Sequence, residues 1–186
     1  MALLLFRVAV TTLAVSVALG CTPIDKVDQG DFCFANYAFE ANITSVKQAD
    51  EYSNYEYTID IKKDYKKNKA IDTIQIISGF GPSHSCGPQI LDIGTSYLIY
   101  AKDLRIITYK SMANVVGTDI ERITTKYDCT CTIKFDFDKY IQMQTISLPP
   151  TTTDECNAPL DYCRRSGYCK RDQGGGCTWG NLGVCN

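Results

Sequence analysis

Apolar and polar residues alternate in short stretches between Phe32 and Val116, and helical periodicity is hard to find there. In one stretch Tyr57, Ile59 and Ile61 share a face, while the residues between them are polar. This pattern, rich in β-branched and aromatic residues, predicts five strands: Phe32–Val46, Glu56–Lys62, Ala70–Ile77, Tyr97–Lys102 and Arg105–Lys110. Five strands suggest a small barrel, which closes on itself and leaves few exposed edges.

A short helix is expected after the last of these strands. Thr118 and Glu121 have the spacing of a capping box, in which both side chains satisfy backbone N–H groups of the first helical turn. The apolar residues that follow fall on one helical face: Ile120, Ile123 and Tyr127. We therefore expect this helix to pack on the barrel.

The composition changes after Leu148, where two prolines and three threonines form a stiff polar connection. The tail beyond it has five cysteines but few aliphatic residues, so it must depend on crosslinks instead of a large core. We expect Trp179, beside Cys177, to pack on a disulfide. The predicted organisation is a leader at 1–20, a mainly β barrel domain at 21–133, and a strand, linker and cysteine-rich subdomain at 134–186.

The first twenty residues resemble a secretory signal peptide, with an early positive charge at Arg7, an apolar stretch, and small residues at Ala18 and Gly20. Cleavage after Gly20 would leave Cys21 as the first residue. The protein is therefore expected to be secreted into the extracellular space, with Asn42 in its single N-glycosylation motif. In that oxidising setting ten cysteines predict five disulfides, formed by Cys21, Cys33, Cys86, Cys129, Cys131, Cys156, Cys163, Cys169, Cys177 and Cys185.

Charge and hydropathy exclude several classes of partner. The chain has 19 basic and 21 acidic residues, and loss of the leader, which carries only Arg7, leaves a net charge of about −3. The densest basic run, Lys62–Lys69, contains Asp64 and is best explained as a solvated loop. We therefore expect a monomer with no nucleic-acid partner and no membrane span.

Motifs for catalysis are missing from the sequence. The single histidine, His84, lies in Ser83-His84-Ser85-Cys86, and Cys86 is expected in a disulfide and not as a free thiolate. No zinc-protease, serine-hydrolase or phosphate-binding motif occurs. We expect a protein that is not an enzyme and that has no cofactor of its own.

A cysteine at the mature N-terminus would combine an α-amine, a backbone carbonyl and a crosslink in one residue. An α-amine titrates near 7.7–8.0, so a useful fraction is neutral at physiological pH, and its nitrogen and the carbonyl oxygen can together chelate Zn²⁺. Such a terminus at Cys21 could displace the water from the open position of a protease zinc. A disulfide at Cys21 would reduce the ordering cost of that binding.

Several segments together resemble the tissue inhibitors of metalloproteinases, whose N-terminal part is a netrin-like domain. The first cysteine and Thr22 look like that family's reactive N-terminus, and Gly30–Cys33 looks like its Phe-Cys segment. Ser85-Cys86-Gly87 resembles its loop that anchors the first cysteine, and Tyr97–Lys102 resembles one of its strands. The resemblance covers most of residues 21–133 and is weak in the tail.

The resemblance implies a five-stranded OB-type barrel and a function as an inhibitor of matrix-type or disintegrin-type zinc metalloproteinases. Cys21 would bind the zinc of the protease, and Thr22 would enter its specificity pocket. The other residues that would contact the enzyme are Pro23, His84, Ser85 and Cys86. The implied disulfides are Cys21–Cys86 and Cys33–Cys129. Three further bridges would form among the six remaining cysteines, in any of fifteen connectivities.

One departure from the family leaves alternatives open. The family begins Cys-x-Cys, whereas this chain has Pro23 at the third position and no cysteine between Cys86 and Cys129. Pro23 restricts Thr22 to extended conformations, which partly compensates for the lost bridge. The alternatives are a secreted netrin-like binding module without inhibitory activity and, less favoured, a bacterial lipoprotein with lipid on Cys21.

Overall fold

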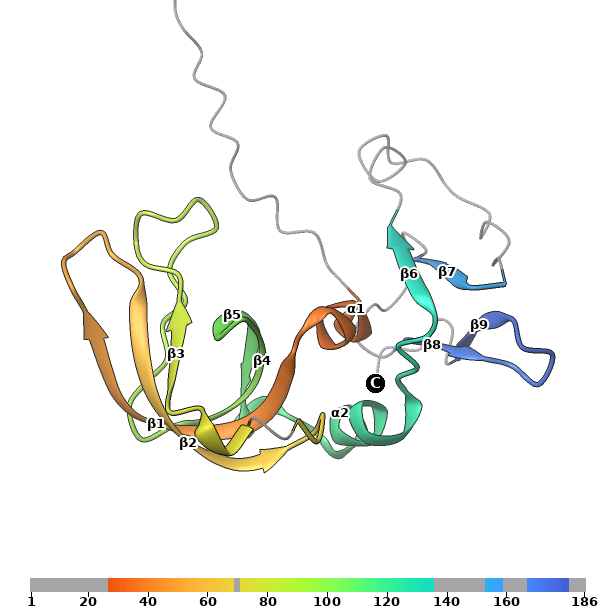
Figure 1. Cartoon of the computed structure of the whole chain (residues 1–186), viewed down its shortest axis with the longest axis horizontal. Coiled ribbons are helices and arrows are strands. Elements are labelled where there is room, and N and C mark those ends of the chain that lie inside the picture. The colour runs from red at the N-terminus through yellow and green to blue at the C-terminus, as the bar shows by residue number, and fades with distance from the viewer. Residues whose placement is uncertain (1–26, 69–70, 136–152, 159–166, 181–186) are drawn as a thin grey trace, which may run out of the picture.

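Five strands form a closed barrel in this computed structural model (Figure 1), which describes residues 27–68, 71–135, 153–158 and 167–180. The strands are β1 (Tyr37–Gln48), β2 (Tyr55–Asp64), β3 (Ile76–Gly79), β4 (Ser96–Lys102) and β5 (Arg105–Ser111). Their order around the barrel is β1-β2-β3-β5-β4, with β4 pairing back to β1. All neighbours are antiparallel except β3 and β5, which meet in parallel at Ser78 and Arg105. This closure is the OB-type barrel that the sequence predicts.

The barrel core follows from the alternation in β1 and β2. Phe39, Ala41 and Ile43 are fully buried in β1, and Tyr57 and Ile59 face them from β2. In contrast, β4 is buried on both faces, which explains its continuous apolar run. One face of β4 lies in the barrel core, and the other lies beneath the helices.

Two short helical segments cover that outer face of β4. The first is α1 (Asp28–Phe34), and the second is α2 (Gly117–Glu121), continued by the π-helical segment η3 (Arg122–Lys126). Phe32 of α1 packs against the rings of Tyr100 and Tyr127, at centroid distances of 5.6 and 5.4 Å. The predicted stripe of Ile120, Ile123 and Tyr127 lies in the apolar cluster that these helical segments form with the outer face of β4. The expectation that this helix packs on the barrel is therefore confirmed.

Two predicted strands are wrong at one end. Residues from Phe32 to Phe34 belong to α1 and not to the first strand, because this turn places Phe32 beneath the second helix. The expected strand from Ala70 is replaced by a 3₁₀ turn, η1 (Ile71–Thr73), and β3 begins only at Ile76. Ile71 and Ile74 are both buried at a spacing of three, which suits a turn, and the Ile74 N–H donates to the Ile71 carbonyl. Ala70 lies outside the described residues.

The predicted capping box is also wrong. The N-cap of α2 is Val116, so Thr118 lies inside the first turn. The Asp119 carboxylate, at the third helical position, accepts a hydrogen bond from the Val116 N–H at 3.1 Å. Asp119 also pairs with Lys110 of β5 and with Arg122, which ties the helix to the barrel. A second 3₁₀ turn, η2 (Met112–Asn114), connects β5 to this helix.

The C-terminal region contributes two small sheets beside the barrel. β6 (Thr132–Phe135) pairs in parallel with β7 (Glu155–Ala158), and β8 (Tyr168–Arg171) pairs antiparallel with β9 (Cys177–Gly180). The expected domain boundary between residues 133 and 134 falls within β6. Disulfides join Cys131 to Cys177 and Cys156 to Cys169, and Trp179 packs on them in a small apolar cluster.

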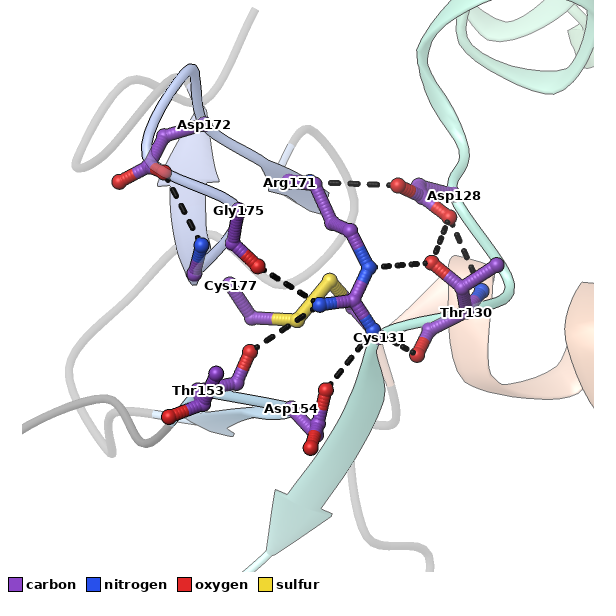
Figure 2. Close-up of polar contacts among 10 residues, drawn as sticks. Asp128, Thr130, Cys131, Thr153, Asp154, Arg171, Asp172, Gly175 and Cys177 are labelled. Atoms are coloured by element: carbon purple, nitrogen blue, oxygen red, sulfur yellow. Dashed lines mark hydrogen bonds and ion pairs between the residues drawn. A yellow bond between two sulfur atoms is a disulfide. The ribbon is translucent and has the colours of Figure 1, made fainter.

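Arg171 links these sheets to the chain that leaves the second helix (Figure 2). Its guanidinium donates to the carbonyls of Thr130, Thr153 and Gly175 and pairs with Asp154 at 2.8 Å. Its backbone N–H donates to the carboxylate of Asp128. Within the described residues, no helix combines the length and the apolar character needed to cross a membrane.

Candidate functional site

The described part of the predicted site is the loop from Phe80 to Gln89, here called the Cys86 loop. Its two ends are joined, because the Gln89 N–H donates to the Phe80 carbonyl and the Phe80 N–H donates to the Gln89 side chain, both at 2.9 Å. The Gln89 amide also donates to the Ile106 carbonyl on β5, at 3.3 Å. The base of the loop is therefore fixed to the barrel wall.

The turn between β1 and β2 supports one side of the Cys86 loop. The Gly81 N–H donates to the Asn54 side chain, and the Ser83 hydroxyl donates to the Tyr52 carbonyl at 2.7 Å. Gly81 lies so close to Ser53 that an added Cβ would overlap the Ser53 carbonyl oxygen. The two loops therefore share one end of the barrel, where Tyr52 is well exposed.

His84 organises the tip of the Cys86 loop. Its imidazole stacks on the Phe80 ring, with centroids 3.5 Å apart and planes within 8°, and its Nδ1 accepts a hydrogen bond from the Cys86 N–H. The Gly87 N–H donates to the His84 carbonyl, and Gly87 has a φ of +78°, which a side chain would disfavour. His84 is half-buried, and its ring is held within the loop by Phe80 and the Cys86 N–H. These contacts indicate a structural role for the imidazole and not that of a base paired with a nucleophile.

Ser85 and Cys86 are exposed at this tip. Cys86 is disulfide-bonded, whereas the six other described cysteines bond to one another. The partner of Cys86 therefore lies outside the described residues. Cys21, Thr22 and Pro23 also lie outside them, as do Cys163 and Cys185, so the structure brings together only His84, Ser85 and Cys86.

The second disulfide that the resemblance implies is present and joins the two helical segments. Cys33 of α1 bonds to Cys129, which follows η3, across a sequence separation of 96 residues. The same region holds a buried carboxylate, Asp28, which accepts hydrogen bonds from the hydroxyls of Tyr127 and Tyr100 at 2.7 and 3.0 Å. Burial raises the pKa of Asp28, and the two hydroxyl bonds oppose that rise.

Three described cysteine sulfurs lie close together but do not form a metal site. Cys131, Cys169 and Cys177 have sulfurs within 4.8 Å of one another. All three belong to disulfides, so they offer no thiolate to a metal ion. The cluster is therefore a pair of adjacent crosslinks.

Asn42 lies in the middle of β1, paired with Asp60 of β2 and Ser96 of β4. Its side chain is half-buried. Glycosylation there remains a prediction.

Two residues that attach the C-terminal sheets to the rest of the protein, Gln29 and Arg171, were missed by the sequence analysis. Gln29 is fully buried, and its amide binds the backbone of Cys169, 140 residues away. Arg171 donates hydrogen bonds to the carbonyls of Thr130 and Gly175, which lie next to the strands of the C-terminal sheets. Neither residue belongs to a motif or a periodic pattern, because both act on backbone groups that only the fold brings together.

Comparison with curated proteins returns no match. Among family models, that of the UNC-6/NTR/C345C module matches residues 30–132. The match includes most of α1, the complete barrel, the Cys86 loop and the second helix, which is more than half of the chain. The chain therefore belongs to the UNC-6/NTR/C345C, or netrin-like, module family.

Proposed function

We propose that this protein is a secreted inhibitor of zinc metalloproteinases of the matrix or disintegrin type. In this proposal the signal peptide is removed after Gly20, and the α-amine and carbonyl of Cys21 chelate the zinc of the protease. Thr22 enters the adjoining specificity pocket, Pro23 keeps the chain extended, and His84 and Ser85 contact the enzyme beside the zinc.

The observation that carries the proposal is the state of Cys86. It is a disulfide-bonded residue, exposed at the tip of a loop that is fixed at its base and on one side. A bridge from such a loop to Cys21 would hold the terminal amine at the protein surface and would limit the entropy lost on binding. Membership of the netrin-like family is consistent with this role, although that family also includes modules that do not inhibit proteases.

The geometry of the Cys86 loop also suits contact with a large partner. Its exposed tip lies beside the β1–β2 turn, where the exposed ring of Tyr52 adds apolar surface. Aromatic side chains are enriched at protein interfaces, because they bury a large area with few rotatable bonds. The two loops could therefore flank the inserted terminus on one side.

The test compares two forms of the purified chain, one that begins at Cys21 and one with a single alanine added before it. Both should give the same circular dichroism spectrum and melting temperature. Inhibition of matrix and disintegrin-type protease catalytic domains should fall at least a hundredfold in the extended form, because its amine no longer lies next to the Cys21 carbonyl. Equal inhibition by the two forms would overturn chelation.

The outcome for the chain that begins at Cys21 also decides between inhibition and the alternative. The departure at Pro23, where the family has a second cysteine, favours a secreted netrin-like module that binds another extracellular protein. No inhibition of any protease in the panel at micromolar concentration would support that alternative.

A further inference from the structure

A groove of about 450 Å³ lies beside the turn of the β4–β5 hairpin, where α1 ends. Its volume falls within the range of ordinary ligand sites. The groove combines aromatic, aliphatic and cationic side chains, and it is here called the hairpin groove. The lining residues on which the argument depends are Phe34, Phe80, Ile106, Ile107, Lys102 and Arg105.

The two cations of the hairpin groove form a like-charged pair. Lys102 and Arg105 lie directly opposite each other across the two-residue turn between β4 and β5. Side chains in this arrangement share one face of the hairpin, and like charges there are destabilising. Within the described residues neither cation forms an ion pair, although Asp103 also lines the groove. The pair therefore presents two positive charges that a carboxylate could bridge.

The turn that carries this pair is held in a conformation that its own residues disfavour. Asp103 and Leu104 have φ angles of +50° and +63°, and a leucine adopts such a left-handed conformation only at a cost. The Asp103 N–H donates to the Asn36 side chain at 3.0 Å, and the Leu104 carbonyl accepts the Ser78 N–H at 2.8 Å. The turn is therefore fixed from both sides. Backbone strain that the surrounding structure maintains in this way is concentrated at functional sites.

The aromatic residues of the hairpin groove are also held in place. Phe34 is 59% exposed, but it follows Cys33, whose disulfide fixes the end of α1 to the chain after η3. The ammonium group of Lys102 lies over the Phe34 ring, 3.6 Å from its centroid. Phe80 begins the Cys86 loop, whose base is bonded to the barrel wall. Aromatic side chains that are positioned in advance lose little entropy when a partner binds.

From these features we propose that the hairpin groove is a docking site for a short acidic segment of a partner protein. An aromatic side chain of that segment lies against Phe34 and Phe80, and a neighbouring carboxylate binds between Lys102 and Arg105. The carboxylate relieves the repulsion within the cation pair, which gives the site its charge complementarity. This inference does not depend on protease inhibition, and it applies equally to a netrin-like binding module.

The same features favour a peptide over a sulfated polysaccharide. A polysaccharide has no apolar side chain to place against the aromatic walls of the hairpin groove. The whole chain has a net charge of −2, so it does not attract a polyanion through its overall field. The positive charge is local and suits one or two carboxylates.

The experiment measures binding of a capped, fluorescently labelled Glu-Phe-Asp-Phe-Glu peptide to the full chain by fluorescence anisotropy. Two control peptides separate the contributions: Lys-Phe-Lys-Phe-Lys reverses the charges, and Glu-Ala-Asp-Ala-Glu removes the aromatic rings. A sulfated heparin disaccharide tests the polysaccharide. Backbone amide shifts in NMR spectra of the labelled protein locate each bound probe.

Two variants of the hairpin groove are measured, each with a matched control. Arg105→Glu is compared with Lys170→Glu, which changes the net charge equally at an exposed position of β8. Phe34→Ala is compared with Ile90→Ala, because the two side chains are 59% and 58% exposed. Melting temperatures show whether each variant is folded. If Arg105→Glu does not fold, Arg105→Gln is measured by the same criteria.

The wild-type chain should bind the acidic aromatic peptide with a Kd of about 100 µM and should show no saturable binding of either control peptide. Arg105→Glu should weaken binding about tenfold, because a repulsion replaces an attraction. Phe34→Ala should weaken it about fivefold through the lost ring contact. Both matched controls should stay within about twofold of wild type, and the amide shifts should centre on residues 102–107.

Other results would overturn the inference. Equal weakening by Arg105→Glu and Lys170→Glu would indicate a general effect of charge and not a site. Amide shifts outside the hairpin and the end of α1 would place the peptide elsewhere. Absence of saturable binding would show that the hairpin groove does not take an acidic segment, and tighter binding of the heparin disaccharide there would identify a polysaccharide site instead.

Discussion

The imidazole of His84 lies flat on the ring of Phe80, with centroids 3.5 Å apart. This stack joins the tip of the Cys86 loop to its base, because Phe80 is also hydrogen-bonded to Gln89. The same imidazole accepts the Cys86 N–H at 3.1 Å. The single histidine of the chain therefore orders the backbone next to a disulfide-bonded cysteine, and this role requires no catalysis.

Replacement of His84 by alanine should release the tip of the loop. It removes an aromatic contact of about 1 kcal/mol and a hydrogen bond of about 1 kcal/mol. Together these should speed hydrogen exchange at the Cys86 amide about thirtyfold, since 1.4 kcal/mol corresponds to a factor of ten. His84→Phe keeps the stack and loses only the acceptor, so its exchange should lie between those of wild type and His84→Ala. Equal exchange in the two variants would show that the stack contributes nothing.

Gly81→Ala should destabilise the protein more than an ordinary surface substitution does. A Cβ at this position overlaps the carbonyl oxygen of Ser53, so one backbone segment must move. We expect a loss of about 2 to 3 kcal/mol in the free energy of unfolding, measured with urea. Gly30→Ala is the control, because a Cβ there meets nothing within 4 Å, and alanine in a helix should stabilise by about 0.5 to 1 kcal/mol. Similar losses in both variants would contradict the close approach of the two loops.

The barrel could be predicted from the sequence because its signal is local. Period-two patches of apolar residues located β2 and β5, and a continuous apolar run located β4, each to within about two residues at each end. The predicted start of the first strand failed because it depends on a contact between distant segments. Phe32 begins an apolar stretch that predicts a strand. It is helical because its ring packs against Tyr127, which lies 95 residues further along the chain. The prediction of the helix cap was wrong for a local reason. Asp119, and not Glu121, is the carboxylate that accepts the N-cap backbone N–H.

The candidate site was only partly accessible to the same reasoning. Ser85 and Cys86 were identified through a motif, and they do lie at an exposed loop tip. The support for that loop comes from Tyr52 and Asn54 on another hairpin, through a backbone carbonyl and a side-chain amide that no sequence pattern marks. Gln29 was missed for the same reason, because its partners are backbone groups of residues 128 and 169.

Arg171→Lys should weaken the attachment of the C-terminal sheets. Arginine reaches four different residues with its planar guanidinium, and a lysine ammonium cannot replace that geometry. The ion pair between Arg171 and the exposed Asp154 contributes little to stability. The loss of stability in the variant should therefore come from the hydrogen bonds to backbone carbonyls. We expect a decrease of about 2 kcal/mol in the free energy of unfolding. Lys170→Ala, at the exposed neighbouring position, should leave that free energy within about 0.5 kcal/mol of wild type, and an equal loss there would contradict a specific role for Arg171.

The stability of α1 should depend on pH through Asp28. Burial raises its pKa in the folded protein above the ordinary value of 3.8, despite the bonds from Tyr127 and Tyr100. At pH values between the unfolded and folded pKa of Asp28, the folded protein binds more protons than the unfolded chain does. The contribution of Asp28 to stability is therefore fully present below its unfolded pKa and is lost as the pH rises through its folded pKa. Asp28→Asn has no carboxyl group to titrate. The stability of the variant relative to wild type should therefore increase as the pH is raised from about 4 to 7.

This difference is measured by urea unfolding of both proteins across that pH range. Asp119, which lies near Asp28, titrates in both proteins and has the opposite linkage. Partial burial acts to raise the pKa of Asp119, but its bonds with Lys110 and Val116 outweigh burial and lower it. Its stabilisation is therefore present above its unfolded pKa and lost as the pH falls. Because this contribution is common to both chains, it should largely cancel in the comparison. A difference that stays constant with pH, or that decreases as pH rises, would show that the buried carboxyl is not harder to ionise in the folded protein than in the unfolded chain.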